Sequence, residues 1–111
     1  MIAATDLVAA DRIKDRILHA AGESVERIVL HGSRATGRAR PSSDYDVLVV
    51  LDDPVEDWVQ ESLRLSELFV DFPHPVDIQV FGVEEFEECR PVPATIAYPA
   101  DQFGAVLYAR R

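Results

Sequence analysis

Residues 31–46, HGSRATGRARPSSDYD, followed by residues 47–51, VLVVL, decide how the rest of this chain can fold. Gly32 and Ser33 come directly after an apolar segment at residues 27–31. Glycine lets the main chain approach an anion closely, and the first amides of a helix that begins at such a turn favour negative charge. The sequence therefore predicts a strand that ends in a phosphate-binding turn.

Two carboxylates, Asp44 and Asp46, open the second apolar segment. Residues two apart on a strand point to the same face, about 6.6 Å apart at about 3.3 Å per residue. Carboxylate oxygens in this arrangement are ligands that Mg²⁺ prefers. We therefore expect the pair to hold a divalent metal opposite the turn at Ser33; the simpler alternative is a surface turn that leads into a strand.

This pattern, Gly-Ser followed by ten residues and Asp-x-Asp, resembles the signature of the DNA polymerase β-like nucleotidyltransferases. The whole string is similar to that of the minimal nucleotidyltransferases, short proteins often encoded beside a HEPN-domain ribonuclease toxin. The resemblance extends over almost the whole chain. The motif positions that carry it are Gly32, Ser33, Gly37, Ser43, Asp44 and Asp46.

The resemblance implies a site for ATP and two Mg²⁺ ions. It implies metal binding and catalysis by Asp44, Asp46 and a third acid, Asp77, which would complete the site and accept the proton of the acceptor. Without the pair, Asp77 would be interpreted as an ordinary carboxylate at the start of a strand. The expected nucleotide-binding residues are Gly32, Ser33, Arg34 and Ser43.

Arginines bracket the Gly-Ser turn, and no acidic residue occurs between residue 27 and Asp44. They form either a solvated loop or, as we expect beside a triphosphate, a source of at least one anion contact. His31 ends the strand before the turn, and we assign no chemical role to it.

The pattern of the chain predicts an α/β (α+β) fold, a small mixed sheet with helices packed on it. The resemblance implies that this is the polymerase β-like nucleotidyltransferase fold. If the turn and the acids serve one triphosphate, the first two strands are antiparallel and the second and third are parallel. We expect a first helix capped by Thr5 or Asp6 and ended by Gly22, and a second that starts at Asp53-Pro54 and runs to Val70. The expected strands lie at residues 25–31, 44–51, 76–81 and 105–108, with a short helix at 83–89 and a loop with turns between it and the last strand.

Composition limits the class of protein. The 111 residues suffice for one domain, 1–111, and 48% of them are hydrophobic, as in globular proteins. The net charge of −9 argues against sequence-independent nucleic-acid binding, which needs clustered cations. Cys89 is the single cysteine, and neither a basic leader nor an apolar run of about 20 residues is present. We expect a cytoplasmic chain that does not contact membrane or nucleic acid directly.

About thirty residues follow the third strand, too few for the acceptor-binding domain of larger relatives. We therefore expect the acceptor to bind largely outside this chain, in a homo- or hetero-oligomer. Similarity to minimal nucleotidyltransferases suggests an antitoxin that transfers AMP from ATP to a tyrosine hydroxyl of a HEPN ribonuclease, whose basic character an acidic chain would complement. The alternatives are an antitoxin that neutralises its toxin by binding alone, and transfer to a small-molecule hydroxyl.

Overall fold

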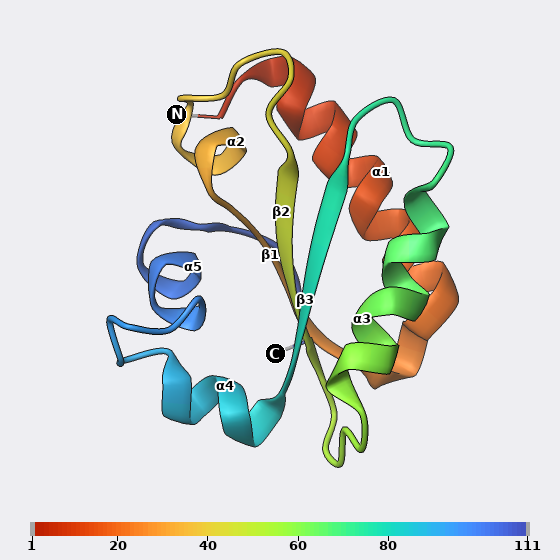
Figure 1. The fold of residues 1–111 in the computed structure, drawn as a ribbon, viewed down its shortest axis with the longest axis vertical. Coiled ribbons are helices and arrows are strands. Elements are labelled where there is room, and N and C mark those ends of the chain that lie inside the picture. The colour runs from red at the N-terminus through yellow and green to blue at the C-terminus, as the bar shows by residue number, and fades with distance from the viewer. Residues whose placement is uncertain (1, 111) are drawn as a thin grey trace.

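A mixed sheet of four strands forms the centre of the structure, a computed structural model that describes residues 2–110 (Figure 1). The strand order is β3-β2-β1-β4. The strands are β1 Val25–His31, β2 Tyr45–Leu51, β3 Val76–Gly82 and β4 Ala105–Ala109. The helices are α1 Ala4–Ala21, α2 Ser33–Thr36, α3 Trp58–Ser66, α4 Val83–Cys89 and α5 Ala97–Phe103, and 3-10 turns lie at Gly22–Ser24 and Glu67–Phe69.

The strand directions confirm the predicted mixed sheet. β1 runs antiparallel to β2 and to β4, whereas β2 and β3 are parallel. Parallel neighbours need a long crossover connection, and the segment that contains α3 provides it. The end of β1, the start of β2 and the start of β3 therefore lie at the same end of the sheet, beside α2 (Figure 1).

Helices cover both faces of the sheet. α1 and α3 lie on one face, and α4 and α5 lie on the other (Figure 1). β2 is buried on both sides: Val47 and Val49 belong to the core under α1 and α3, and Leu48 and Val50 belong to the smaller core under α4 and α5. This two-sided burial explains why residues 47–51 are apolar without alternation.

The predicted start of α3 is wrong. The helix begins at Trp58, where the Asp57 side chain accepts a hydrogen bond from the Gln60 N–H at 3.0 Å. Asp53 instead accepts a hydrogen bond from the Glu84 N–H at 3.0 Å, so it supports the start of α4. The α-helix also ends at Ser66 and continues as a 3-10 turn. Asp-Pro is a good helix start in isolation, but here the carboxylate binds the main chain of another element.

Two further differences concern the ends of the chain. α1 begins at Ala4 without a side-chain cap, and Asp6 lies buried within it instead of capping it, whereas Gly22 ends it as predicted. Residues 97–103, expected as part of a loop, form the helix α5. A Cβ at Gly104 would overlap the Ala100 carbonyl, so the small residue lets the chain pass from α5 into the edge strand β4.

None of the helices among residues 2–110 has both the length and the apolar composition that crossing a membrane requires.

Candidate active site

The Gly-Ser turn forms as predicted between β1 and α2. Gly32 has a φ of +72°, which is unfavourable for residues with a side chain, and it precedes the first helical residue, Ser33. Gly37, at φ +77°, ends this short helix. A Cβ at Gly32 would overlap Oδ2 of Asp46. The glycine therefore lets the turn lie directly against one of the predicted carboxylates.

The sheet register brings two of the three predicted acids side by side. His31 pairs with Asp46 across β1 and β2, and Asp46 pairs with Asp77 across β2 and β3. Paired residues in adjacent strands project from the same face, so the three side chains form one row on the face covered by α4 and α5. Asp44 lies just before β2, near enough for its charge to act on Asp46. Asp44 and Asp77, 33 residues apart in the sequence, thus both lie beside Asp46.

His31 and Gln79 extend this row. The Gln79 side-chain amide donates a hydrogen bond to Oδ2 of Asp77 at 2.7 Å, and its oxygen lies 2.9 Å from Nε2 of His31. Because the Gln79 oxygen can only accept, His31 donates from Nε2. Sequence reasoning gave His31 no role; its position at the end of β1, opposite Asp46, was the signal that could have found it.

The carboxylates carry uncompensated negative charge. Burial raises the pKa of Asp46, His31 lowers it, and the charges of Asp77 and Asp44 raise it further. Across residues 2–110, no lysine or arginine forms an ion pair with any of these three acids. A bound cation would therefore relieve the repulsion that the sheet imposes on the row.

The donor chemistry of the three acids suits a hard divalent cation, because all the available ligands are carboxylate oxygens. In the described part of the chain, however, no three acidic, histidine or cysteine side chains are already gathered as a metal site. Asp77 directs Oδ2 toward Gln79. The backbone thus brings the acids together, while their side chains would have to turn to share an ion.

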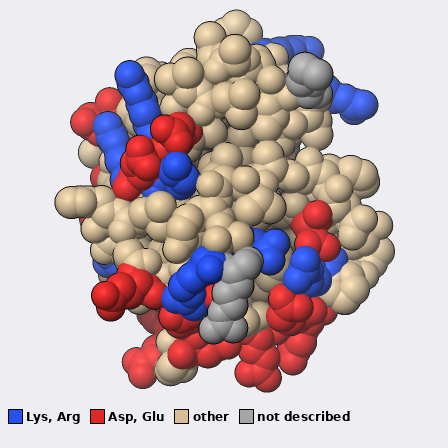
Figure 2. Space-filling model, turned by 180° about the vertical axis from the view of Figure 1, so that it is seen from behind, with Lys and Arg blue, Asp and Glu red and all other residues tan. Residues whose placement is uncertain are grey.

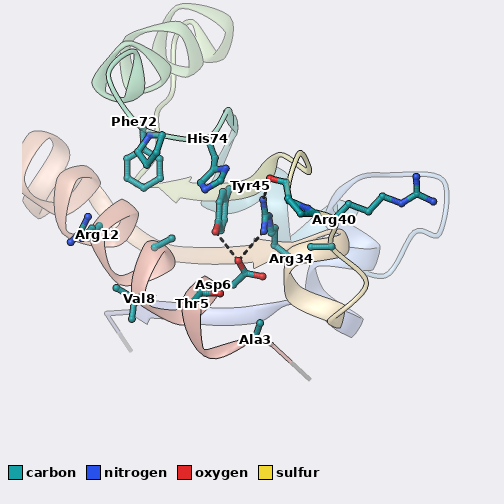
Figure 3. Close-up of a pocket in the computed structure, with 14 residues that line it drawn as sticks. Ala3, Thr5, Asp6, Val8, Arg12, Arg34, Arg40, Tyr45, Phe72 and His74 are labelled. Atoms are coloured by element: carbon teal, nitrogen blue, oxygen red, sulfur yellow. Dashed lines mark hydrogen bonds and ion pairs between the residues drawn. The ribbon is translucent and has the colours of Figure 1, made fainter.

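Arg34 lies beside Asp6 and the ring of Tyr45 (Figure 3). Its side chain is buried, and it donates hydrogen bonds to Asp6 at 3.0 Å and to the carbonyl of Ser43 at 2.8 Å. It also packs over the ring of Tyr45, 4.5 Å from the centroid. Arg34 therefore supports the loop between α2 and β2 from the α1 face, and contact with a nucleotide stays a prediction for it.

Ser43 closes the same loop. Its hydroxyl accepts a hydrogen bond from the Arg40 N–H at 2.8 Å, and its own N–H donates to the Arg40 carbonyl at 2.9 Å. The Arg40 side chain extends away from Asp6, Arg34 and Tyr45 (Figure 3). Ser43 thus fixes the backbone just before Asp44, and direct nucleotide binding by Ser43 likewise stays a prediction.

The partner of Arg34 was missed by the sequence analysis. Asp6 accepts hydrogen bonds from Arg34 and from the Tyr45 hydroxyl, the latter at 2.7 Å. Burial and then the hydrogen bond to Asp6 raise the pKa of Tyr45 to about 12. A signal was present, since Asp6 lies four residues before Ala10 on the buried stripe of α1. A hollow of about 520 Å³ beside this cluster is lined by none of the three candidate acids.

Known proteins resemble this chain in fold and in family. Three solved structures share the fold. One is a Sulfolobus solfataricus protein assigned as a nucleotidyltransferase, with a TM-score of 0.63, 18% identity, and coverage of 96% of this chain and 86% of that one. Another is a toxin–antitoxin complex with AMP-PNP, with a TM-score of 0.64, 17% identity, and coverage of 91% and 74%.

The third is the toxin–antitoxin pair MntA-HpeT with two Asp-to-Glu substitutions, with a TM-score of 0.60, 14% identity, and coverage of 91% and 74%. No curated protein matches the chain. A family model described as "Nucleotidyltransferase domain" matches residues 10–99, which include both the Gly-Ser turn and all three acids. The chain therefore belongs to the nucleotidyltransferase domain family.

Proposed function

We propose that this chain transfers AMP from ATP to a hydroxyl group of a partner protein, and that the partner is a HEPN-type ribonuclease toxin. The observation that carries the proposal is the row formed by Asp46 and Asp77, with Asp44 beside it and the Gly32 turn against it. A turn whose amides can bind phosphate and carboxylates that can hold metal ions are the two parts that we assign to nucleotidyl transfer.

Each part of the site has a role in this reaction. The main-chain amides at Gly32 and Ser33 bind the β- and γ-phosphates, and Asp44, Asp46 and Asp77 hold the metal. Two Mg²⁺ ions held by these carboxylates would supply positive charge next to the acceptor hydroxyl and the α-phosphate. A bond forms between the acceptor oxygen and the α-phosphorus, the bond to the β-phosphate oxygen breaks, and pyrophosphate leaves.

Asp77 is the residue that we assign to the acceptor proton. It is the exposed member of the row and lies on the outermost strand, whereas Asp46 is partly buried between two strands. The Gln79 amide holds one oxygen of Asp77, which leaves the other free to accept the proton in this proposal. His31, bonded to the same amide, fixes the orientation of Gln79 and acts as a positioning residue.

The proposed partner rests on charge and on the solved relatives. Acidic side chains gather at the end of the molecule that α4 and the loop before α3 form (Figure 2). Four exposed glutamates lie on α4 alone: Glu84, Glu85, Glu87 and Glu88. A basic RNA-cleaving protein would complement this surface. Two relatives are toxin–antitoxin structures, one of them with AMP-PNP, and the substitutions in the other are two positions apart, as Asp44 and Asp46 are here. Chain, ATP and toxin would meet in the cytoplasm.

Transfer can be measured with α-labelled ATP, Mg²⁺ and a HEPN ribonuclease as the candidate acceptor. We expect label on that protein, and Asp44→Asn or Asp46→Asn to reduce the rate about 100-fold or more, because each removes a metal ligand. Asp15→Asn, which removes an exposed carboxylate from α1, is the matched control and should keep the rate.

Two other results would contradict the proposal. If cells stay protected from the toxin when Asp44→Asn and Asp46→Asn are combined, neutralisation occurs by binding alone. If label appears on a small hydroxyl compound and never on protein, the acceptor class is wrong.

A further inference from the structure

A groove of about 390 Å³ follows the outer edge of β3 and begins at Asp77. Residues 77–81 line its length. α3 contributes Trp58, Val59 and Leu63 to one side, and Glu85 and Ile96 line it as well. The groove therefore connects the acid that we assign to the acceptor proton with an apolar surface outside the nucleotide site.

The apolar side chains of the groove are exposed although they lie close together. Trp58 is 55% exposed and Leu63 is 56% exposed, and Val59 and Ile96 are about half exposed. Single exposed apolar residues are common on protein surfaces, but several that line one groove mark a binding surface. The position beside Asp77 indicates that what binds here also reaches the reaction.

The main chain at this edge can accept another strand. β3 is the outermost strand of the sheet, and within residues 2–110 no strand pairs with its outer side. An edge strand offers main-chain donors and acceptors to an extended peptide. The stretch from Asp77 to Phe81 spans about 13 Å, which fits four or five residues of such a peptide.

We propose that the groove along β3 binds an extended segment of the acceptor protein as an additional strand, which presents a serine, threonine or tyrosine hydroxyl at Asp77. This inference rests on the proposed function. The row His31, Asp46 and Asp77 continues across the sheet, so the peptide residue opposite Asp77 projects from the same face, with Cβ atoms about 5 Å apart. The residues on either side of it project toward the apolar side chains of α3.

The charge of the residues that line the groove indicates the composition of the bound segment. The groove has two acidic lining residues, Asp77 and Glu85, and none of its lining residues, all within the described part of the chain, is lysine or arginine. The segment therefore alternates apolar residues with basic ones around the hydroxyl. A second copy of this chain is a poor occupant, because each copy carries a net charge of −9.

Synthetic peptides of the pattern Val-Arg-Val-X-Val-Arg-Val, with X as serine, threonine or tyrosine, test the groove by fluorescence anisotropy. We expect Leu63→Lys to weaken peptide binding about tenfold or more, because it places a cation in the apolar part of the groove. Val70→Lys makes the same charge change at a residue that is 86% exposed and outside the groove, so binding should change less than about twofold.

AMP-PNP binding with Mg²⁺, measured on the same three proteins, separates this inference from the proposed function. Equal AMP-PNP binding in all three shows that the variants fold, and peptide binding lost in Leu63→Lys alone then supports the groove. If no peptide binds the unsubstituted protein, or if both variants bind alike, the groove assignment is wrong, even where AMP-PNP binds. A dimer that Leu63→Lys dissociates would also overturn it, since a second copy would then occupy the groove. Failure of AMP-PNP to bind the unsubstituted protein contradicts the proposed function instead.

Discussion

Two carboxylates, those of Asp6 and Asp46, lie near one end of the sheet in opposite environments. Tyr45 and Asp46 are neighbours in β2 and project from opposite faces. On the α1 face, Asp6 is 4% exposed and is bonded to Arg34 and to the Tyr45 hydroxyl. On the α4 and α5 face, Asp46 is partly buried beside two other acids. One carboxylate has its cation within the protein, and the other has like charges as neighbours.

The difference separates a structural acid, Asp6, from Asp46, the acid to which we assign a functional role. Asp6 joins α1, α2 and β2 through a satisfied network, so its charge stabilises the fold. Asp46 is held against Gly32 and next to Asp77 by the backbone, so its charge raises the energy of the folded state. The network thus positions the loop that leads to Asp44 and to the start of β2.

The largest effect on stability is expected from breaking the Asp6 network. Arg34→Met leaves Asp6 buried without its cation, and such a change costs about 3 to 5 kcal/mol. Urea unfolding measures this loss. Arg64→Met is the control, because Arg64 forms an exposed pair with Glu61 on α3 that contributes less than about 1 kcal/mol. Equal losses in both variants would show that the burial of Arg34 does not matter.

A smaller loss of stability, combined with a loss of activity, is expected at the turn. Gly32→Ala introduces strain of about 1 to 2 kcal/mol at positive φ, and its Cβ would displace the Asp46 carboxylate. Gly22→Ala imposes strain at φ +39° in open space, so it serves as the control. We expect nucleotidyl transfer to fall about tenfold or more only in Gly32→Ala. Loss of activity in both variants would attribute the effect to stability alone.

The sequence predicts the positions of Gly32 and the three candidate acids better than it predicts the pairing of Asp6 with Arg34. Gly32, Asp44 and Asp46 lie in one local stretch, and the alternation around Asp77 places that acid on a strand. The polar row therefore follows from strand directions and register. By contrast, Asp6 and Arg34 are 28 residues apart, and although the stripe of α1 indicates that Asp6 is buried, it does not indicate which residue pairs with it. Their pairing depends on how α1 packs, which local patterns do not specify.

The same limit applies to α3 and to the groove. Asp53 and Asp57 are both suitable caps, and the choice between them follows from a contact of Asp53 with α4. The groove requires that β3 be the edge strand and that α3 leave Trp58 and Leu63 exposed beside it. From the sequence alone, the spacing of Val55, Val59, Leu63 and Val70 would indicate a helix face buried in the core. Only the three-dimensional arrangement shows that part of the stripe faces solvent next to Asp77.

The smallest change in stability is expected at Asp46, where a substitution should raise the Tm, unlike the substitutions above. Burial, together with the charges of Asp77 and Asp44, holds the pKa of Asp46 above its ordinary value of 3.8, although His31 opposes the shift. The folded protein then binds this proton more tightly than the unfolded chain, so its contribution to stability is lost as the pH rises from about 3.8 through the pKa of the folded state. At pH 7 without metal, Asp46→Asn should therefore have a higher Tm than the unsubstituted protein.

The sign of this effect distinguishes the two kinds of acid. The Tm advantage of Asp46→Asn should shrink as the pH falls toward 3.8, because the unsubstituted protein then binds the proton itself. Added Mg²⁺ should raise the Tm of the unsubstituted protein more than that of the variant, since a bound cation removes the repulsion. Asp6→Asn should lower the Tm at pH 7, because its carboxylate is paired with Arg34. A loss of stability in both variants would mean that Asp46, too, is a structural acid.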